Sequence, residues 1–266
     1  MAKGAPTVQN LYRYPVKGLS PEPLARAMLS AGHYFPGDRL FAIENGPSGF
    51  DPAAPAYQPK TKFLMLMRNE RLAALVTRFD DATATLTIRD GEREAVKADL
   101  SSREGRLALE AFFRRFMSKE LRGPPKVLAA PDGFRFTDSG RGFVSILNLA
   151  SIAALESAAG APLHPLRFRA NIYVVGWPAW AEFDLIGREI AIGPSARLKV
   201  TKRIRRCAAT EVDPDSGIRD LPVPRTLLDA FGHADCGVYA EVITGGTVAV
   251  GDAFAEVEAR QQEMLL

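Results

Sequence analysis

Short runs in which apolar and polar residues alternate dominate the chain, and this period of two is typical of β-strands. Such runs predict strands in 7–16, 37–46, 71–80 and 84–100, with Asp90-Gly91 as the turn of a hairpin. Further strands are predicted in 167–175, 188–193, 196–204 and 238–252, the last as a hairpin that turns at Gly245-Gly246. The segment 47–62 is rich in proline and is predicted to be a loop.

Helical periodicity is confined to three segments. Residues 101–121 begin with Ser101 and Glu104 at the spacing of a capping box and continue with a stripe of apolar residues that predicts core packing. A second helix is predicted over 148–159 with Gly160 as its stop, and a short third one from Pro224. These helices are too few to cover a doubly wound sheet, so the pattern predicts a mainly β fold with a few helices, of the α+β class.

The chain has 266 residues, which is enough for one large or two smaller domains. Gly123-Pro124-Pro125 is the best candidate boundary, and it predicts domains over 5–125 and 126–260. A net charge of +3 does not indicate nucleic acid or a membrane surface as a partner. The first residues lack the apolar core of a signal peptide, and no apolar run approaches the roughly 20 residues of a membrane helix. We therefore expect a cytoplasmic protein without a membrane or nucleic-acid partner.

The cysteines and histidines exclude two common structural sites. Cys207 and Cys236 form no CxxC motif, and a reducing compartment argues against a disulfide framework. His33, His164 and His233 are far apart in the sequence and have no zinc-ligand spacing, so a structural zinc site is not expected.

Cys207 comes directly after three arginines in four residues, Arg203, Arg205 and Arg206. Nearby cations stabilise a thiolate, and in a strand Arg203 and Arg205 would share the face of Cys207 while Arg206 takes the other. A thiolate is a soft metal ligand and arginine suits phosphate, so the combination would serve a cofactor that carries both. The alternative is that Cys207 is a small buried residue beside solvated arginines, the interpretation that we adopt for Cys236. Binding of nucleic acid is disfavoured, because no stacking aromatic residues interleave these arginines.

Several segments resemble the MOSC-domain proteins, a family named for the C-terminal domain of molybdenum cofactor sulfurases. LYRYPVKGLSPEPL and GDRLFAIENG resemble the β-rich N-terminal domain that often precedes the MOSC domain. Four later segments resemble the MOSC β-barrel itself: RFRANIYVVG, AEFDLIGREIAIG, RCAATEVDPDSG and VYAEVITGGTVAVGD. The resemblance spans nearly the whole chain and extends to the mitochondrial amidoxime reducing component and its bacterial relatives.

The resemblance implies a set of site residues. Cys207 would ligate the metal of the molybdenum cofactor (molybdopterin), and Asp213 would lie beside the metal as a catalytic candidate. Contacts to the pterin and its phosphate would come from Lys17, Arg39, Ser145, Asn148, Arg169 and Asn171. Each of these has a structural alternative, and Asp213 lies in DPDSG, which is first of all a turn sequence. At the level of the family, pyridoxal phosphate binding is also implied.

The resemblance further implies a reaction, the reduction of small N-oxygenated compounds such as N-hydroxylated amines and amidoximes. The chain has no glycine motif for flavin or nicotinamide, and two cysteines cannot hold a four-cysteine iron–sulfur cluster, so a separate electron-donor reductase is expected. The alternative is a carrier of the molybdenum cofactor, or of sulfur on Cys207, without substrate turnover. Three departures from the family bear on substrate preference more than on the fold: Gly18 for serine, Ala170 for proline, and AYQPKTKFL for a TARQEP-like segment.

Overall fold

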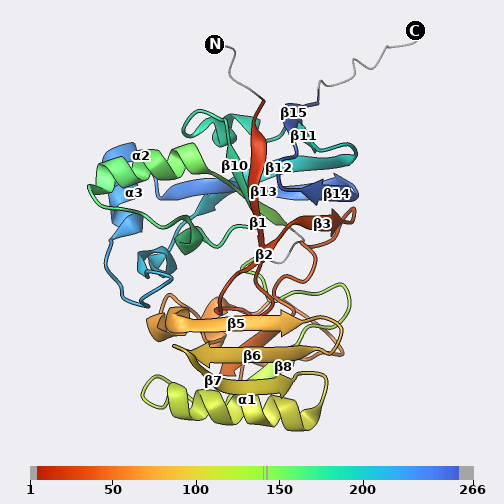
Figure 1. Ribbon diagram of the computed structural model, residues 1–266, viewed down its shortest axis with the longest axis vertical. Helices are drawn as coiled ribbons and strands as arrows, with labels where there is room; N and C mark the ends of the chain where they lie inside the picture. Colours follow the sequence, from red (N-terminus) through yellow and green to blue (C-terminus); the bar gives the residue numbers. More distant parts are fainter. Residues whose placement is uncertain (1–4, 140, 142, 258–266) are drawn as a thin grey trace.

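The computed structural model describes residues 5–139, 141 and 143–257. The first four residues, and residues 258–260 of the second predicted domain, lie outside this description. The molecule has two parts that are stacked along its long axis, an upper part with a large sheet and a lower part with a small sheet and one long helix (Figure 1). Mainly β structure with three α-helices confirms the predicted fold class.

The upper part is built on an eight-stranded sheet with the order β15-β11-β12-β13-β9-β10-β1-β2. Neighbouring strands are antiparallel except β9 and β10, which are parallel. Buried Val, Ile and Leu side chains of these strands form its core. The strands are β1 (Thr7–Arg13), β2 (Glu22–Leu24), β9 (Val144–Asn148), β10 (Ile172–Val175), β11 (Glu189–Ile192), β12 (Ala196–Arg205), β13 (Asp235–Thr244) and β15 (Phe254–Glu256).

The hairpin predicted at Gly245-Gly246 does not form. Strand β14 (Gly246–Ala249) pairs with β3 (Arg26–Leu29) in a separate two-stranded sheet. At its end, β13 pairs with β12 as far as Thr244 on one edge, and on the other, beyond its pairs with β9, the Val242 carbonyl oxygen accepts from the Gly32 N–H, so both edges are engaged. The chain therefore leaves the sheet at the two glycines, where a Cβ on Gly245 would lie 2.8 Å from the Leu29 carbonyl oxygen.

The lower part contains the three-stranded meander β5 (Leu75–Asp80), β6 (Thr85–Asp90) and β7 (Arg93–Asp99). Asp90 pairs with Arg93, so the turn of the predicted hairpin is one residue later, at Gly91-Glu92. Helix α1 (Arg103–Phe116) packs against β7 and β8, and the pair β4 (Phe41–Asn45) and β8 (Pro125–Ala129) completes the part. Leu109, Phe112 and Phe113 are buried, which confirms the apolar stripe of the predicted helix.

Two helices lie beside the upper sheet, α2 (Leu149–Ala159) and α3 (Val223–Phe231) (Figure 1). Gly160 ends α2 in the left-handed conformation with φ 66°, as the sequence predicted. Short 3-10 helices occupy Lys60–Lys62, Glu70–Ala74, Pro165–Phe168, Ala181–Leu185 and Ala208–Glu211. Among the described residues, no helix is long and apolar enough to cross a membrane.

The strand predicted over 167–175 is shorter than expected. Only its second half forms β10, whereas Arg167 lies within the 3-10 helix Pro165–Phe168 and Arg169 has a φ of 52°. The division of the chain at residue 125 stays a prediction.

Candidate functional site

A cavity of about 400 Å³ lies between the two parts of the molecule. Its lower wall comes from residues that adjoin the lower core, at 17–18, 38–39, 60 and 65–67. Its upper wall comes from β12 and from single residues of β9 and β13, and from the segments that precede β9 and β10 and follow β12. Segments far apart in the sequence therefore meet at one place.

Six of the eight candidate site residues line this cavity: Lys17, Arg39, Ser145, Arg169, Asn171 and Cys207. They come from both walls, and no local sequence pattern joins them.

The thiol of Cys207 lies just beyond the end of β12, at the start of the 3-10 helix Ala208–Glu211. It is partly exposed to the cavity rather than buried, unlike Cys236, which is fully buried. Cys236 packs in a core cluster, which confirms it as a core residue, and burial raises its pKa to about 12. Cys207 is therefore the one of the two thiols that a ligand in the cavity can reach.

The cation that contacts Cys207 is a lysine. Lys60 Nζ lies 3.3 Å from Cys207 Sγ. Arg203 and Arg205 are both exposed on β12, with the buried Ile204 between them, but the strand ends at Arg205, so the predicted alternation does not extend to Arg206 and Cys207. Arg206 instead donates to the carbonyl oxygens of Cys236 and Phe168.

Lys17 is nearly buried and is held by two acceptors. Its ammonium donates to the carbonyl oxygen of Phe136 at 3.0 Å and to the carboxylate of Asp138. Burial lowers the pKa of Lys17, and Asp138 opposes this shift. Burial would raise the pKa of Asp138, but Lys17 and Lys60 hold it at about 2, so this carboxylate is charged between two lysines.

Two arginines enclose the ring of Tyr14. The guanidinium carbons of Arg39 and Arg169 lie 4.5 and 4.3 Å from the ring centroid. Both residues have positive φ, 48° and 52°, a conformation that is uncommon for residues other than glycine. Asp38 pairs with Arg39, whereas no carboxylate among the described residues pairs with Arg169.

This end of the cavity has more buried cationic groups than anionic partners. Burial lowers the pKa of Arg169 to about 10, and the neighbouring Arg39 adds to this shift. The Nη2 atoms of Arg169 and Arg206 are buried and have no hydrogen-bond partner among the described residues. A buried cation without a partner is costly, and a bound anion would remove that cost.

Ser145 and Asn171 bind each other across the wall of the cavity. The Asn171 side-chain oxygen accepts hydrogen bonds from the Ser145 hydroxyl at 2.8 Å and its N–H at 3.2 Å. The Asn171 amide nitrogen donates to the carbonyl oxygen of Tyr12 at 3.2 Å. These contacts fix the segment that precedes β10 and use most of the hydrogen-bonding capacity of the Asn171 side chain.

Two candidate residues do not line the cavity, Asn148 and Asp213. Asn148 is fully buried, and its side chain caps α2 and donates to Glu182 at 2.9 Å. Asp213 accepts from Ser216 within a turn and from Arg167 at 3.0 Å, as DPDSG predicts for a turn. Burial opposes the charged form of Asp213, but the hydrogen bonds from Ser216 lower its pKa.

The backbone explains why residue 18 is glycine here and not the serine that many family members have. Gly18 has a φ of 84°, and a Cβ at this position would lie 2.9 Å from the carbonyl oxygen of Leu64. The backbone therefore leaves no room for the serine side chain that many family members have.

The sequence interpretation missed two residues of the site, Lys60 and Asp138. They lie 147 and 121 residues from their partners Cys207 and Lys17. The only signal for Lys60 is its place in AYQPKTKFL, the segment noted as a departure from the family.

Two family models match the chain, together covering most of it. The MOSC N-terminal beta barrel domain matches residues 5–119, and the MOSC domain matches residues 135–255.

Curated relatives match over part of their length. The chain is 31% identical over 119 residues to mitochondrial amidoxime-reducing component 1 from Homo sapiens, which is 40% of this chain and 34% of that protein. It is 32% identical over 123 residues to mitochondrial amidoxime reducing component 2 from Bos taurus, 41% of this chain and 35% of that protein. The match thus spans about a third of the length of these relatives. Among solved structures, the YuaD protein from Bacillus subtilis aligns over 94% of both chains with 16% identity and a TM-score of 0.44.

Proposed function

The chain belongs to the MOSC-domain proteins and carries the MOSC N-terminal beta barrel domain, and on this basis we propose that it is a molybdenum-cofactor oxidoreductase. Its substrates would be small N-oxygenated compounds, which is the class that the names of its curated relatives indicate. The single observation that carries the proposal is the cavity that joins a reachable thiol to buried, unpartnered arginine groups.

The residues of the cavity fit such a cofactor. A cysteine thiolate is a soft ligand for molybdenum, and the Cys207 Sγ lies in the cavity, 3.3 Å from Lys60 Nζ. Arg169 and Arg39 suit the phosphate, because a phosphate supplies the acceptors that Arg169 Nη2 lacks. We leave Asn148 and Asp213 out of the proposed binding set, because their side chains are committed elsewhere.

When bound, the cofactor would supply the two-electron redox chemistry. The net reaction takes an N-hydroxylated amine, two electrons and two protons to the amine and water. The chain would orient the substrate in the cavity, where Lys60 and the phenol of Tyr239 would present protonated groups to it.

The electrons would come from a separate reductase protein, since the sequence offers no flavin, nicotinamide or iron–sulfur motif. A cytoplasmic location is part of the same proposal. The pyridoxal phosphate binding implied at the family level stays a prediction.

The proposal is tested by the molybdenum and pterin content of protein purified from a host that makes the cofactor. We expect close to one molybdenum per chain in the native protein and a loss of at least tenfold in Cys207→Ser. Cys236→Ala is the matched control, because it removes the other thiol away from the cavity and should keep the metal.

Turnover then separates the enzyme from the carrier. Reduction of benzamidoxime with a chemical electron donor supports the oxidoreductase. Transfer of cofactor to a molybdenum-free acceptor enzyme, without turnover, would support the carrier instead. Absence of molybdenum from both the native protein and Cys207→Ser would contradict the proposal.

A further inference from the structure

The wall of the cavity has many more basic than acidic residues. Two acids line it, Asp38 and Asp138, against ten basic residues: Lys17, Arg39, Lys60, Arg141, Arg167, Arg169, Lys202, Arg203, Arg205 and Arg206. Half of the basic residues have an acidic partner, namely Lys17, Arg39, Lys60, Arg141 and Arg167. The cavity therefore has an excess of positive charge among its described residues.

Three of the remaining five are held by groups outside the cavity or by the backbone. Arg169 and Arg203 lie on rings that do not line the cavity, Tyr14 and Phe183, at 4.3 and 4.2 Å from the ring centroids. Arg206 binds backbone carbonyl oxygens. Lys202 and Arg205 are left, both on β12 and both exposed. No ion pair or side-chain hydrogen bond within the described part of the chain engages either of them.

Lys202 is held at an aromatic wall. It is the register partner of Tyr239 on β13, and its Nζ lies 5.0 Å from the ring centroid of Phe143 and 5.7 Å from that of Tyr239. The two rings are stacked, with centroids 5.3 Å apart and an interplanar angle of 24°. Cation–π attraction thus places the ammonium beside an apolar surface that lines the cavity.

This aromatic wall and the thiol belong to one cavity. Phe143, Tyr239, Lys60 and Cys207 all line it. Lys60 Nζ lies 3.3 Å from Cys207 Sγ. A flat molecule on the wall would therefore lie beside Lys202 in the same cavity as the thiol.

We propose that Lys202 and the Phe143–Tyr239 wall make the cavity selective for aromatic N-oxygenated substrates that carry a carboxylate. The ring packs at the wall and the carboxylate pairs with Lys202, in the cavity that Cys207 also lines. This inference rests on the proposed function and specifies its substrate class. Charged groups at such a site give specificity, because a neutral analogue leaves the cations unpaired.

The test compares benzamidoxime with 4-carboxybenzamidoxime in the molybdenum-loaded protein, with a chemical electron donor. We expect a higher kcat/KM for the carboxylate, and Lys202→Met should lower the ratio of the two kcat/KM values about tenfold, as expected for the loss of a charge-assisted contact. Lys202→Glu should invert the preference. Lys199→Met is the matched control, since Lys199 is exposed on the same strand but does not line the cavity.

A second readout does not depend on turnover. Calorimetric binding of 4-carboxybenzamide to cofactor-free protein should weaken about tenfold in Lys202→Met and should not change in Lys199→Met. The inference would be overturned if the ratio of the two kcat/KM values were equal in native protein and Lys202→Met, or if Lys202→Met bound 4-carboxybenzamide as tightly as native protein does. In that case, turnover of benzamidoxime would still support the proposed function. Absence of turnover for both substrates would count against the proposed function, and calorimetry would then decide the inference separately.

Discussion

The carboxylate of Asp138 balances the two lysines of the cavity. It contacts Lys17 directly and lies 3.8 Å from Lys60, which in turn contacts the thiol of Cys207. The charge on this one residue therefore acts on both lysines, one of which contacts the thiol of Cys207.

We expect the contribution of Asp138 to stability to disappear in acid. Its pKa is lowered from 3.8 to about 2, so its stabilising effect is complete above about pH 4 and is lost as the pH falls toward 2. The effect should be about 1 kcal/mol, because the side chain is 46% exposed and solvent screens the pair. Urea unfolding of native protein and Asp138→Asn between pH 2 and 6 measures it.

The control for this experiment is Asp229→Asn, which removes a carboxylate paired with Arg225 on an exposed face of α3. The difference in unfolding free energy between native protein and Asp138→Asn should shrink as the pH falls. A difference that stays constant from pH 6 to 2 would argue against a charged Asp138 between the lysines.

At the scale of elements, the cap of α1 differs by one residue from the sequence prediction. The side chain of Ser102 accepts from the N–H of Gly105 at 2.9 Å, whereas Ser101 donates to Asp99. The predicted pair of Ser101 and Glu104 is therefore not the capping box of this helix.

The cap predicts a difference between two neighbouring serines. Ser102→Ala should lower the free energy of unfolding by about 1 kcal/mol, because it removes the acceptor for an otherwise unpaired helical N–H. Ser101→Ala should cost less than about half of that, because Ser101 makes an exposed contact outside the helix. Chemical denaturation of both variants measures the difference, and the reverse order would show that the cap is at Ser101.

Local sequence patterns predicted helices and their ends better than they predicted which strands pair and which distant side chains meet. The stripe of α1 and the stop at Gly160 depend on neighbouring residues, and both are confirmed. The hairpin at Gly245-Gly246 failed, because the choice between β13 and β3 as a partner depends on which strand edges the rest of the sheet has occupied. Lys60 was missed for the same reason, since its contact with Cys207 depends on the packing of the whole chain.

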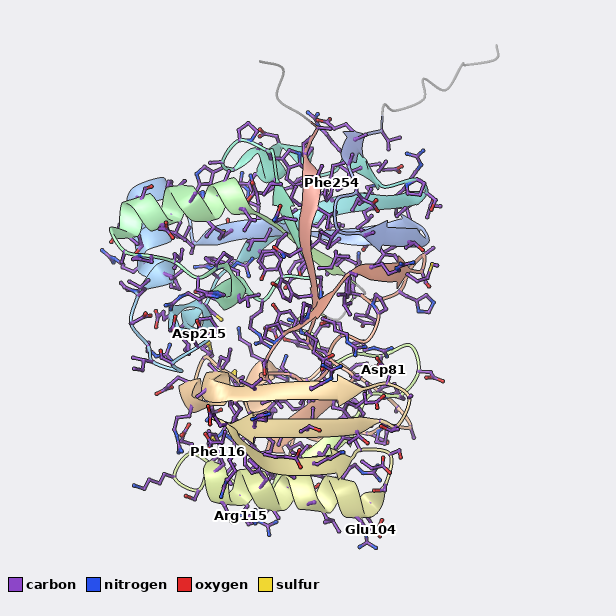
Figure 2. The ribbon with its side chains drawn as sticks, viewed as in Figure 1. Asp81, Glu104, Arg115, Phe116, Asp215 and Phe254 are labelled. Atoms are coloured by element: carbon purple, nitrogen blue, oxygen red, sulfur yellow. The ribbon has the colours of Figure 1, made fainter. Side chains whose placement is uncertain are left out.

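At the scale of the molecule, the segment after Cys207 connects the two parts. Arg219 lies in this segment and donates to the carbonyl oxygen of Met67 at 3.2 Å and pairs with Glu70 at 3.4 Å, both in the lower part. Gly217 is also close to Ala74. Figure 2 shows Asp215 of the same segment between the two parts.

We expect Arg219→Gln to loosen this connection without unfolding the protein. The segment 212–220 should be cleaved several-fold faster in limited proteolysis, because it loses its contacts to the lower part. The free energy of global unfolding should fall by less than about 1 kcal/mol, because the ion pairs of Arg219 are partly exposed. Arg188→Gln, which breaks an exposed pair with Glu256 away from the cavity, should leave the cleavage rate unchanged. Equal cleavage in both variants would rule out Arg219 as the connection.

The pairing of β1 with β10 and of β3 with β14 also sets the order in which the upper part can be completed during synthesis. Strand β1 leaves the ribosome roughly 160 residues before β10, and at roughly 5–20 residues per second this is a wait of about ten to thirty seconds. Strand β3 waits longer still, because its partner β14 lies near the end of the described chain. Through this interval the nascent chain presents unpaired strand edges, the kind of surface through which nascent chains aggregate.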